Sequence, residues 1–351
     1  MRVLKQLNEQ LGERENLTDE QVAQAVSELV EASVSDELKA DFLCALGQKG
    51  ETVGEITAFA RELRARGIVP PIDAETRAGT ILDVCGTGGD RLNTFNISTT
   101  ASFVCAAAGV AVAKHGNRAI TSQTGSADVL EALGMKIDLP PAEAARSLRE
   151  HRFAFFFAPF YRPAFRNIAA ARKLCAGRGQ RTIFNFLGPL LNPAQPDTQL
   201  VGVPSPDLCP MLAQALQALG LRRGMVVSGR VGEAWLDELS TLGENVIAEF
   251  YQERGFAEAS LAHTDFPVQS AALADLAGGD REANAAMIRR LLRNEDRGPK
   301  RDAVLLNAGA GLFVAGKAPT VSDGWELADE VLASGRAAAK LEELVAVRPG
   351  D

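Results

Sequence analysis

The sequence has no excess of basic residues and no long hydrophobic run. Its 351 residues carry 45 acidic and 37 basic side chains, a formal net charge of −8, which argues against general affinity for nucleic acid or an acidic membrane surface. The start, MRVLKQLNEQ, is too polar for a signal peptide, and the longest nearly apolar stretch, residues 101–113, is shorter than the roughly 20 residues of a membrane span. We therefore expect a cytoplasmic protein without a membrane or nucleic-acid partner.

The sequence also has few cysteines, and none of them has the spacing of a metal knuckle. Five are present, an odd number, and they are spread widely along the chain: Cys44, Cys85, Cys105, Cys175 and Cys209. This usage is typical of a reducing compartment and predicts buried structural thiols rather than disulfides.

The first 68 residues predict a small all-helical domain. Leu, Val, Ala and Phe recur at helical spacing, and the stretches TDEQ and SDEL supply an N-cap Thr or Ser followed by acids. The paired prolines of RGIVPPIDAE would stop a helix and stiffen a connection. We place the boundary within residues 67–75, which gives a helical domain over residues 1–70 and a second domain over residues 71–351.

The second domain predicts an α/β fold with a mostly parallel sheet flanked by helices, because strand-like and helix-like segments alternate. The strand candidates are ILDV, GVAVAK, FAFFFA, GMVVSG and DAVLLNAG, and the helical ones include TTASFVCAAAG, SADVLEALG, LAQALQALG and REANAAMIRRLL. Residues 161–190 break the alternation with a helical pattern and a basic loop. We expect this segment to pack on the N-terminal helices.

A glycine-rich loop, GTGGD, follows the strand candidate ILDV, and NISTTASFV then opens a helix. Backbone N–H groups freed by glycine and hydroxyls at a helix start suit a phosphate or pyrophosphate. The third glycine of the dinucleotide fingerprint and the lysine of the Walker loop are both absent. The loop alone therefore fits a tight structural turn as well as it fits a phosphate site.

A second polar loop follows the strand candidate GVAVA. Its donors crowd into thirteen residues and comprise Lys114, His115, Asn117, Arg118, Thr121, Ser122 and Ser126. In open α/β sheets the carboxyl edge of the strands binds ligands, and two adjacent loops of this kind suggest a ligand with two anionic ends. For Arg118 an ion pair at the base of the loop is an equal alternative, and for His115 a hydrogen bond that braces the loop.

Two adjacent carboxylates, Asp237 and Glu238, lie in the loop WLDELS after the strand candidate GMVVSG. Both can face one cleft only from irregular backbone, where they would offer Mg2+ the hard oxygen ligands that it prefers. A solvated acidic turn is the alternative. A polyphosphate nearby would make Mg2+ their natural partner.

In this order, the stretches GTGGD, NIST, KHGNR, GSADVLEALG, RTIFN, LDELS and RDAVLLNA resemble the anthranilate phosphoribosyltransferases of tryptophan biosynthesis, and the resemblance extends over nearly the whole chain. It implies a fold like that of pyrimidine nucleoside phosphorylases. It also implies Mg2+-dependent transfer of phosphoribose from phosphoribosyl pyrophosphate (PRPP) to the amine of anthranilate, and a homodimer formed through the small helical domain.

The resemblance also implies roles for individual residues. The PRPP site would comprise Gly86, Gly89, Asp90, Thr94, Asn96, Ile97, Ser98, Thr99, Lys114, His115, Gly116, Asn117, Arg118, Ala119, Ile120, Thr121, Ser122 and Ser126. Anthranilate would contact Gly86, Asn117 and Arg172. Two Mg2+ ions per monomer would be bound, one by Ser98 with Glu238 and the other by Asp237 with Glu238.

The sequence departs from the family pattern at a few positions. Arg162 replaces the usual histidine in YRPAF, where it would either alter the acceptor pocket or lie on the surface. The chain is also longer between Arg172 and Thr182, and the loop GRVGEAWLDE is lengthened. His151 and His263 lie in no motif and are expected at the surface. The competing functions are a nucleoside phosphorylase-like enzyme and a non-catalytic, nucleic-acid-binding paralogue, but the complete KHGNR and DE motifs argue against both.

Overall fold

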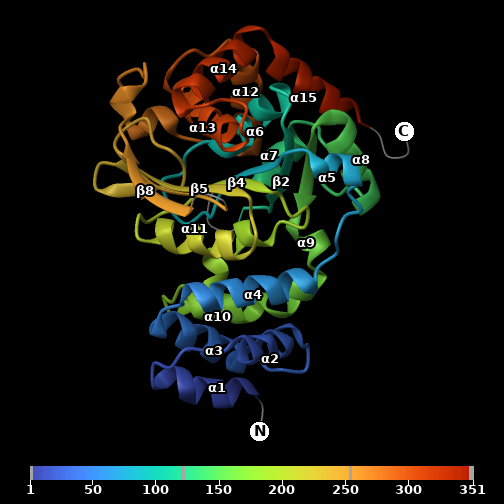
Figure 1. Cartoon of the computed structure of the whole chain (residues 1–351), viewed down its shortest axis with the longest axis vertical. Coiled ribbons are helices and arrows are strands. Elements are labelled where there is room, and N and C mark those ends of the chain that lie inside the picture. Colours follow the sequence, from blue (N-terminus) through green and yellow to red (C-terminus); the bar gives the residue numbers. More distant parts are fainter. Residues whose placement is uncertain (1–2, 120–122, 253–254, 348–351) are drawn as a thin grey trace.

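The computed structural model describes residues 3–119, 123–252 and 255–347. Its N-terminal part is a lobe of four helices, seen at the lower end of Figure 1: α1 (Val3–Gly12), α2 (Asp19–Val30), α3 (Asp36–Lys49) and α4 (Val53–Ala65). The predicted caps are confirmed, since Thr18 and Ser35 accept hydrogen bonds from the first turns of α2 and α3. Thr18 forms a capping box with Gln21, which satisfies N–H groups that a helix start leaves unpaired.

The larger part is built on one sheet, to which the described residues contribute eight strands in the order β3-β2-β1-β4-β5-β7-β8, with β6 paired to β5. Neighbouring strands from β3 to β5 are parallel, and β6, β7 and β8 pair antiparallel. The strands are β1 (Ile81–Gly86), β2 (Ala111–Gly116), β3 (Phe153–Phe157), β4 (Thr198–Gly202), β5 (Arg223–Val231), β6 (Ala234–Leu236), β7 (Asn245–Tyr251) and β8 (Gly255–Leu261). The predicted fold class is confirmed.

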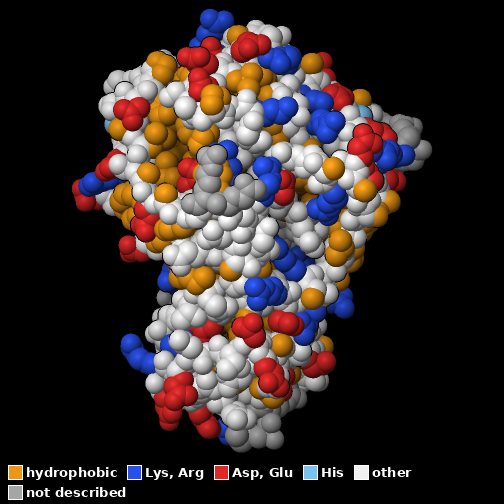
Figure 2. Space-filling model, in the orientation of Figure 1, with side chains coloured by type: hydrophobic (Ala, Val, Ile, Leu, Met, Phe, Trp, Pro, Cys, Tyr) orange, Lys and Arg blue, Asp and Glu red, His pale blue; other side chains and the backbone are white. Residues whose placement is uncertain are grey.

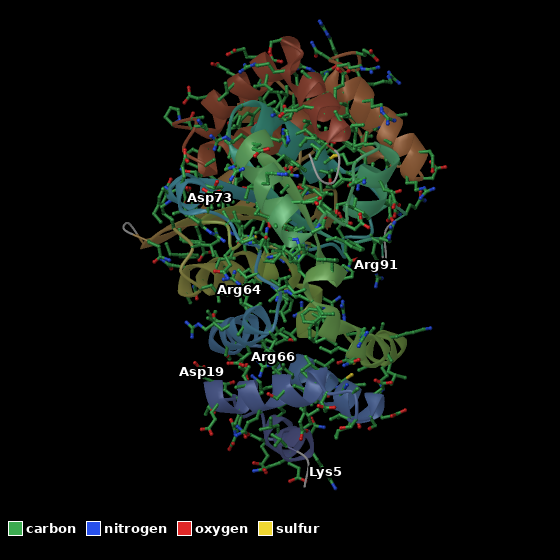
Figure 3. The ribbon with its side chains drawn as sticks, turned by 90° about the vertical axis from the view of Figure 1, so that its right-hand side faces the viewer. Lys5, Asp19, Arg64, Arg66, Asp73 and Arg91 are labelled. Carbon is green, nitrogen blue, oxygen red and sulfur yellow. The ribbon has the colours of Figure 1, made fainter. Side chains whose placement is uncertain are left out.

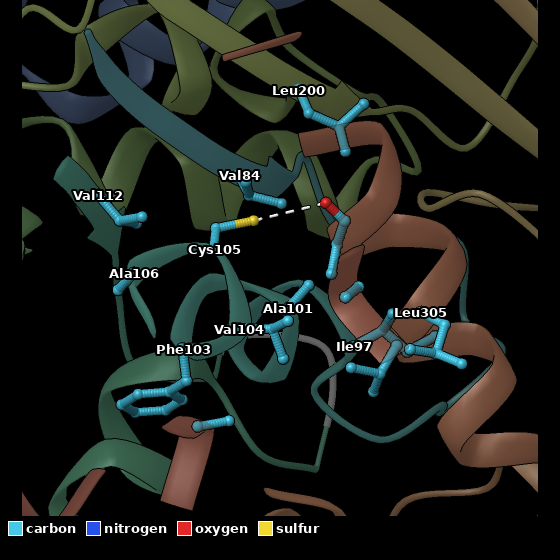
Figure 4. Close-up of a cluster of buried hydrophobic side chains, with 14 of the residues drawn as sticks. Val84, Ile97, Ala101, Phe103, Val104, Cys105, Ala106, Val112, Leu200 and Leu305 are labelled. Atoms are coloured by element: carbon cyan, nitrogen blue, oxygen red, sulfur yellow. Dashed lines mark hydrogen bonds between the residues drawn. The ribbon is translucent and has the colours of Figure 1, made fainter. Parts of the chain in front are cut away.

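Helices cover both faces of this sheet (Figure 1). One face packs against α6 (Ile97–Ala107), whose Cys105 donates from Sγ to the carbonyl oxygen of Ala308 at 3.6 Å (Figure 4). The remaining helices of the sheet domain are α5 (Ala74–Ala78), α7 (Ser126–Ala132), α8 (Pro141–His151), α11 (Leu208–Ala218), α12 (Arg281–Leu292), α13 (Pro299–Val314), α14 (Val321–Ala333) and α15 (Arg336–Ala346). No helix among the described residues is long and apolar enough to cross a membrane.

The segment after β3 returns to the helical lobe. It forms α9 (Ala158–Tyr161), α10 (Ala169–Gly177) and short 3-10 turns at Pro163–Asn167, Ile183–Asn185 and Gly188–Leu191. Nζ of Lys39, on α3, donates to the carbonyl oxygen of Asn167 at 2.7 Å, and α10 shares a hydrophobic core with the lobe and with α11. This second core lies on the face of the sheet opposite to α6.

Two sequence expectations are wrong in detail. The stretch DAVLLNAG, residues 302–309, is the middle of α13 rather than a strand, and it is buried over its whole length. The lengthened loop before Asp237 is a hairpin in which β6 pairs antiparallel with β5, so the acidic pair follows β6 and not β5 directly. Two further short 3-10 turns, His263–Asp265 and Leu273–Leu276, precede α12.

Acidic and basic side chains are interspersed over the face of the molecule shown in Figure 2. His151 and His263 are both partly exposed, and Nδ1 of His151 lies 2.7 Å from Oε1 of Glu343. All five cysteines are buried and free of disulfides, as expected.

Candidate active site

A cavity of about 310 Å3 opens at the carboxyl edge of the sheet, where β1 and β2 end beside each other. Its walls come from the loops after β1 and β2, the start of α6 and the segment after β6. The predicted PRPP residues that line it are Gly86, Gly89, Asp90, Thr94, Asn96, Ile97, Ser98, Thr99, Lys114, His115, Gly116, Asn117, Arg118, Ala119 and Ser126. Asp237 and Glu238 line it as well. Ile120, Thr121 and Ser122 lie outside the described residues.

The glycine-rich loop crosses the mouth of the cavity with backbone that favours glycine. Gly88 and Gly89 have φ values of +78° and +94°, a region in which a Cβ atom is strained. The N–H of Thr87 donates to the carbonyl oxygen of Gly202 at 2.9 Å, and the N–H of Gly88 donates to Oδ2 of Asp237 at 2.6 Å. The loop is therefore tied both to β4 and to the acidic segment.

Close backbone contacts explain two further glycines. A Cβ on Gly86 would lie 2.2 Å from Oδ2 of Asp237, and a Cβ on Gly202 would lie 1.8 Å from the carbonyl oxygen of Asp237. Both distances are far below van der Waals contact. The ends of β1 and β4 thus leave room for the acidic segment only because neither position carries a side chain.

The two carboxylates of this segment line the cavity, with Glu238 buried and Asp237 half-buried. Burial raises the pKa of Asp237 well above its ordinary value, and the negative charges of Asp90 and Glu238 raise it further. Burial also raises the pKa of Glu238 to about 7, against the opposing charge of Lys114 and hydrogen bonds from Ser98. Carboxylates crowded together in this way gain most from a cation that would neutralise them.

The start of α6 faces the same carboxylates. The backbone N–H of Ser98 donates to Oε1 of Glu238 at 3.1 Å. Asn96 precedes the helix, and its side chain forms no cap hydrogen bond with the helix backbone. The side-chain amide of Asn96 is therefore directed to partners other than α6 itself.

The second loop supplies a buried cation and a neutral imidazole. Lys114 is 1% exposed, and its Nζ donates to the carbonyl oxygen of Val84 at 2.8 Å; burial lowers its pKa, while Asp83 opposes the shift. Burial, together with the charge of Arg162, lowers the pKa of His115 to about 3. His115 is therefore neutral at pH 7, and its buried Nε2 has no hydrogen-bond partner among the described residues.

Arg118 forms an ion pair at the base of its loop, one of the two roles that the sequence allowed for it. Nη1 and Nη2 donate to the two carboxylate oxygens of Glu131 at 2.9 and 3.1 Å, and Nη1 also reaches Oδ1 of Asp128. Oδ2 of Asp128 accepts the N–H groups of Ala119 and Gly125. These bonds fold the described ends of the loop back on the start of α7.

Two arginines lie away from this cavity. Arg172, on α10, is half-buried with its guanidinium 5.3 Å from the centre of the Phe184 ring, and it does not line the cavity. Arg162 is 4% exposed, so the surface position considered for it is wrong. Its guanidinium donates to the carbonyl oxygens of Leu63, on α4, and Leu191. Figure 3 labels the next residue of α4, Arg64, where the helical lobe meets the sheet domain.

Sequence reasoning missed several lining residues: Cys85, Thr87, Gly88, Arg91, Asn93, Phe95, Thr124 and Gly125. All of them lie between or beside residues that were singled out, at the end of β1 or within the two loops. Treating each loop as a continuous wall would have found them, since backbone groups contribute as much to a phosphate site as side chains do.

Comparison with known proteins gives consistent matches over the whole chain. Residues 5–67 match the helical bundle domain of a glycosyl transferase family and residues 78–338 match its a/b domain. Anthranilate phosphoribosyltransferase from Petrotoga mobilis is 44% identical over 331 residues, 94% of this chain and 93% of that protein.

Two solved structures share the fold. Anthranilate phosphoribosyltransferase from Thermus thermophilus has a TM-score of 0.87 at 43% identity, and the match covers 99% of both chains. The Saccharomyces cerevisiae enzyme in complex with PRPP and Mg has a TM-score of 0.86 at 25% identity, with 97% of this chain and 96% of that chain covered.

Proposed function

Because the chain belongs to the anthranilate phosphoribosyltransferase family, we propose that it transfers the phosphoribosyl group of PRPP to the amine of anthranilate and releases pyrophosphate. The observation that carries this proposal is a single cavity lined both by the two loops that follow β1 and β2 and by the carboxylates of Asp237 and Glu238. PRPP needs both, since its phosphates require N–H donors and its pyrophosphate is a strong ligand for a divalent cation.

The carboxylates fit Mg2+. Half-buried Asp237 and buried Glu238 both have raised pKa values, and a hydrogen bond fixes Asp237 against the glycine-rich loop. Among the described residues no group of three or more His, Cys, Asp or Glu is arranged as a metal site. Mg2+ commonly binds through one or two carboxylates plus substrate phosphates and water, so PRPP would complete the coordination.

We assign Glu238 and Ser98 to one Mg2+ and Asp237 and Glu238 to a second. When bound, Mg2+ would stabilise the negative charge that develops on the departing pyrophosphate. The chain's own contribution is the alignment of donors. Backbone N–H groups of the GTGGD loop and the buried ammonium of Lys114 lie on the cavity wall, where preorganised dipoles and charges stabilise the transition state more than the bound substrate.

The acceptor needs positioning more than activation. The aromatic amine of anthranilate is neutral at pH 7, so the protein has to hold its nitrogen in line with the anomeric carbon. We assign Gly86 and Asn117 to the acceptor end of the cavity. Arg172 would bind the carboxylate, since a guanidinium donates two parallel hydrogen bonds.

We further propose that the enzyme acts in the cytoplasm as a homodimer paired through the helical lobe. The buried, unpaired thiols are consistent with a reducing compartment. Leu174, 38% exposed on α10, leaves an apolar side chain on the lobe surface. Analytical ultracentrifugation tests the dimer, and a monomer at micromolar concentration would contradict it without bearing on the activity.

The activity is tested by mixing the purified protein with PRPP, Mg2+ and anthranilate and following anthranilate fluorescence. We expect the fluorescence to fall only when all three components are present, with pyrophosphate released in equal amount. Unchanged fluorescence with folded protein across a range of Mg2+ concentrations would refute the proposal. Phosphate-dependent release of a base from a nucleoside would instead indicate a phosphorylase.

A further inference from the structure

A buried asparagine outside the sequence motifs holds a residue of the cavity wall. Asn284, on α12, is 2% exposed, and its Nδ2 donates to Oδ1 of Asn96 at 3.0 Å. The two residues are 188 positions apart in the chain. Asn96 lines the cavity whereas Asn284 does not, so Asn284 acts on the cavity through its neighbour.

The backbone fixes which way the amide of Asn284 faces. Its Oδ1 accepts a hydrogen bond from the N–H of Gly279 at 2.7 Å. A backbone N–H can only donate, so the oxygen of Asn284 must face Gly279 and its NH2 group must face Asn96. The side chain of Asn96 then has to present its oxygen to Asn284.

The hydrogen bond that Asn96 makes to Thr124 requires the same orientation of the Asn96 amide. Nδ2 of Asn96 donates to the carbonyl oxygen of Thr124 at 3.1 Å, and a carbonyl oxygen can only accept. Backbone groups thus fix the orientation of both amides from both ends. An amide nitrogen carries two hydrogens, so one N–H of Asn96 remains for a ligand in the cavity.

The backbone segment that orients Asn284 is itself bonded to the loops that line the cavity. The N–H of Phe95 donates to the carbonyl oxygen of Leu276 at 3.0 Å, and Oγ1 of Thr124 donates to the carbonyl oxygen of Gly279 at 2.9 Å. The segment that orients Asn284 is therefore bonded to both loops of the cavity. Its position is set by the same elements that would surround the ligand.

We propose that Asn284 is a positioning residue that makes Asn96 present an N–H donor, and not its carbonyl oxygen, to the substrate. The inference rests on the proposed function, in which that substrate is PRPP with its phosphate and hydroxyl oxygens. A reversed amide would place an oxygen beside phosphate oxygens, where it would repel them. Binding of an anionic substrate would then depend on a residue that never contacts it.

Asn284→Asp tests this relationship. A carboxylate still accepts the N–H of Gly279 but cannot donate to Asn96. A reversed Asn96 amide gives up its neutral hydrogen bond to Thr124 and gains one to the charged carboxylate, which is the stronger of the two. We expect KM for PRPP to rise about tenfold or more, the effect of losing one hydrogen bond to a charged group, with a smaller change in kcat. In an Asn96→Ala background the same substitution should change KM less than about twofold, because its target is gone.

Two controls separate this role from a structural one. Ala285→Gly destabilises the same helix at the next position, where the side chain is buried, and should leave KM for PRPP unchanged. Urea unfolding shows whether Asn284→Asp is folded. An equal rise of KM in both backgrounds, or a KM equal to that of the wild type, would overturn the inference. A wild-type protein that does not turn over PRPP would refute the proposed function instead.

Discussion

The backbone N–H of Ser98, at the start of α6, donates a hydrogen bond to Oε1 of Glu238 at 3.1 Å. Ser98 follows β1 in the chain, and Glu238 lies 140 residues further on, after β6. With the bond from Gly88 to Asp237, it fixes both carboxylates to the loop after β1. The candidate metal ligands and the candidate phosphate loop therefore form one unit.

The first prediction concerns the charge of this pair. The double substitution Asp237→Asn with Glu238→Gln should lower kcat/KM by about a thousandfold or more, because the cation that stabilises the leaving group loses its ligands. Stability should not fall, since buried like charges are removed and both amides can still accept hydrogen bonds. Fluorescence kinetics and urea unfolding check this, with exposed Glu244→Gln as control. Normal activity in the double variant would refute the metal assignment.

The second prediction concerns pH. Glu238 has its pKa raised by burial from 4.5 to about 7, so the folded protein binds this proton more tightly than the unfolded chain does. Protonation of Glu238 therefore adds to the free energy of unfolding at low pH, and this contribution is lost as pH rises from about 4.5 through about 7. Without Mg2+, the free energy of unfolding of the wild type should fall relative to Glu238→Gln between about pH 5 and pH 8.

Urea unfolding at several pH values measures that difference directly. Comparing the two proteins cancels titrating groups that Glu238 does not influence, such as Asp83, whose pKa burial raises to about 6. Asp237 contributes to the difference, because the charge of Glu238 raises its pKa. Mg2+ competes with the proton at Glu238, so the stabilisation of the wild type by Mg2+ should grow with pH over the same interval. A difference between the proteins that does not depend on pH would contradict the raised pKa.

The third prediction concerns close packing. In Gly202→Ala, the new methyl group would lie 1.8 Å from the carbonyl oxygen of Asp237. Backbone cannot move aside as a flexible side chain can, so we expect a loss of about 3 kcal/mol in the free energy of unfolding and a fall in activity as Asp237 shifts. Gly54→Ala lies in α4, where its methyl group would be 3.9 Å from Oγ1 of Thr52, and should be neutral or stabilising. Similar stabilities for the two variants would count against this explanation.

Local patterns predicted those parts of the fold that depend on neighbours in sequence. The caps of α2 and α3 depend on residues within one turn, and the two candidate phosphate loops follow their strands directly. The stretch within α13 was misread because a helix buried on all sides is apolar all round and shows no period of 3.6. Its short apolar run therefore looked like a buried strand.

Relationships between distant residues could not be predicted in this way. Asn284 contacts Asn96 across 188 positions, and nothing in the spacing of α12 indicates it. Arg162 was expected either to alter the acceptor pocket or to lie on the surface, and a guanidinium is costly to bury unless it is hydrogen-bonded. Its burial depends on the carbonyl oxygens of Leu63 and Leu191, which are 99 and 29 positions away.

The fourth prediction follows from that burial. In Arg162→Met the carbonyl oxygens of Leu63 and Leu191 lose their donor, and we expect a loss of about 2 kcal/mol in the free energy of unfolding. Arg166→Met, an exposed arginine of the same segment, is the matched control and should change stability little. Thermal and urea unfolding compare them, and equal effects would mean that Arg162 does not hold the lobe to the sheet domain.

The last prediction tests the acceptor site. The guanidinium of Arg172 lies over the Phe184 ring, outside the cavity that would bind PRPP, so its removal should separate the two substrates. Arg172→Ala should raise KM for anthranilate by about tenfold to a hundredfold, since hydrogen bonds to a charged group are lost, and leave KM for PRPP unchanged. Lys173→Ala, exposed on the next position of α10, should alter neither. If Arg172→Ala also leaves KM for anthranilate unchanged, the carboxylate is bound elsewhere, and Asn117 and the loop after β2 become the candidates for holding it.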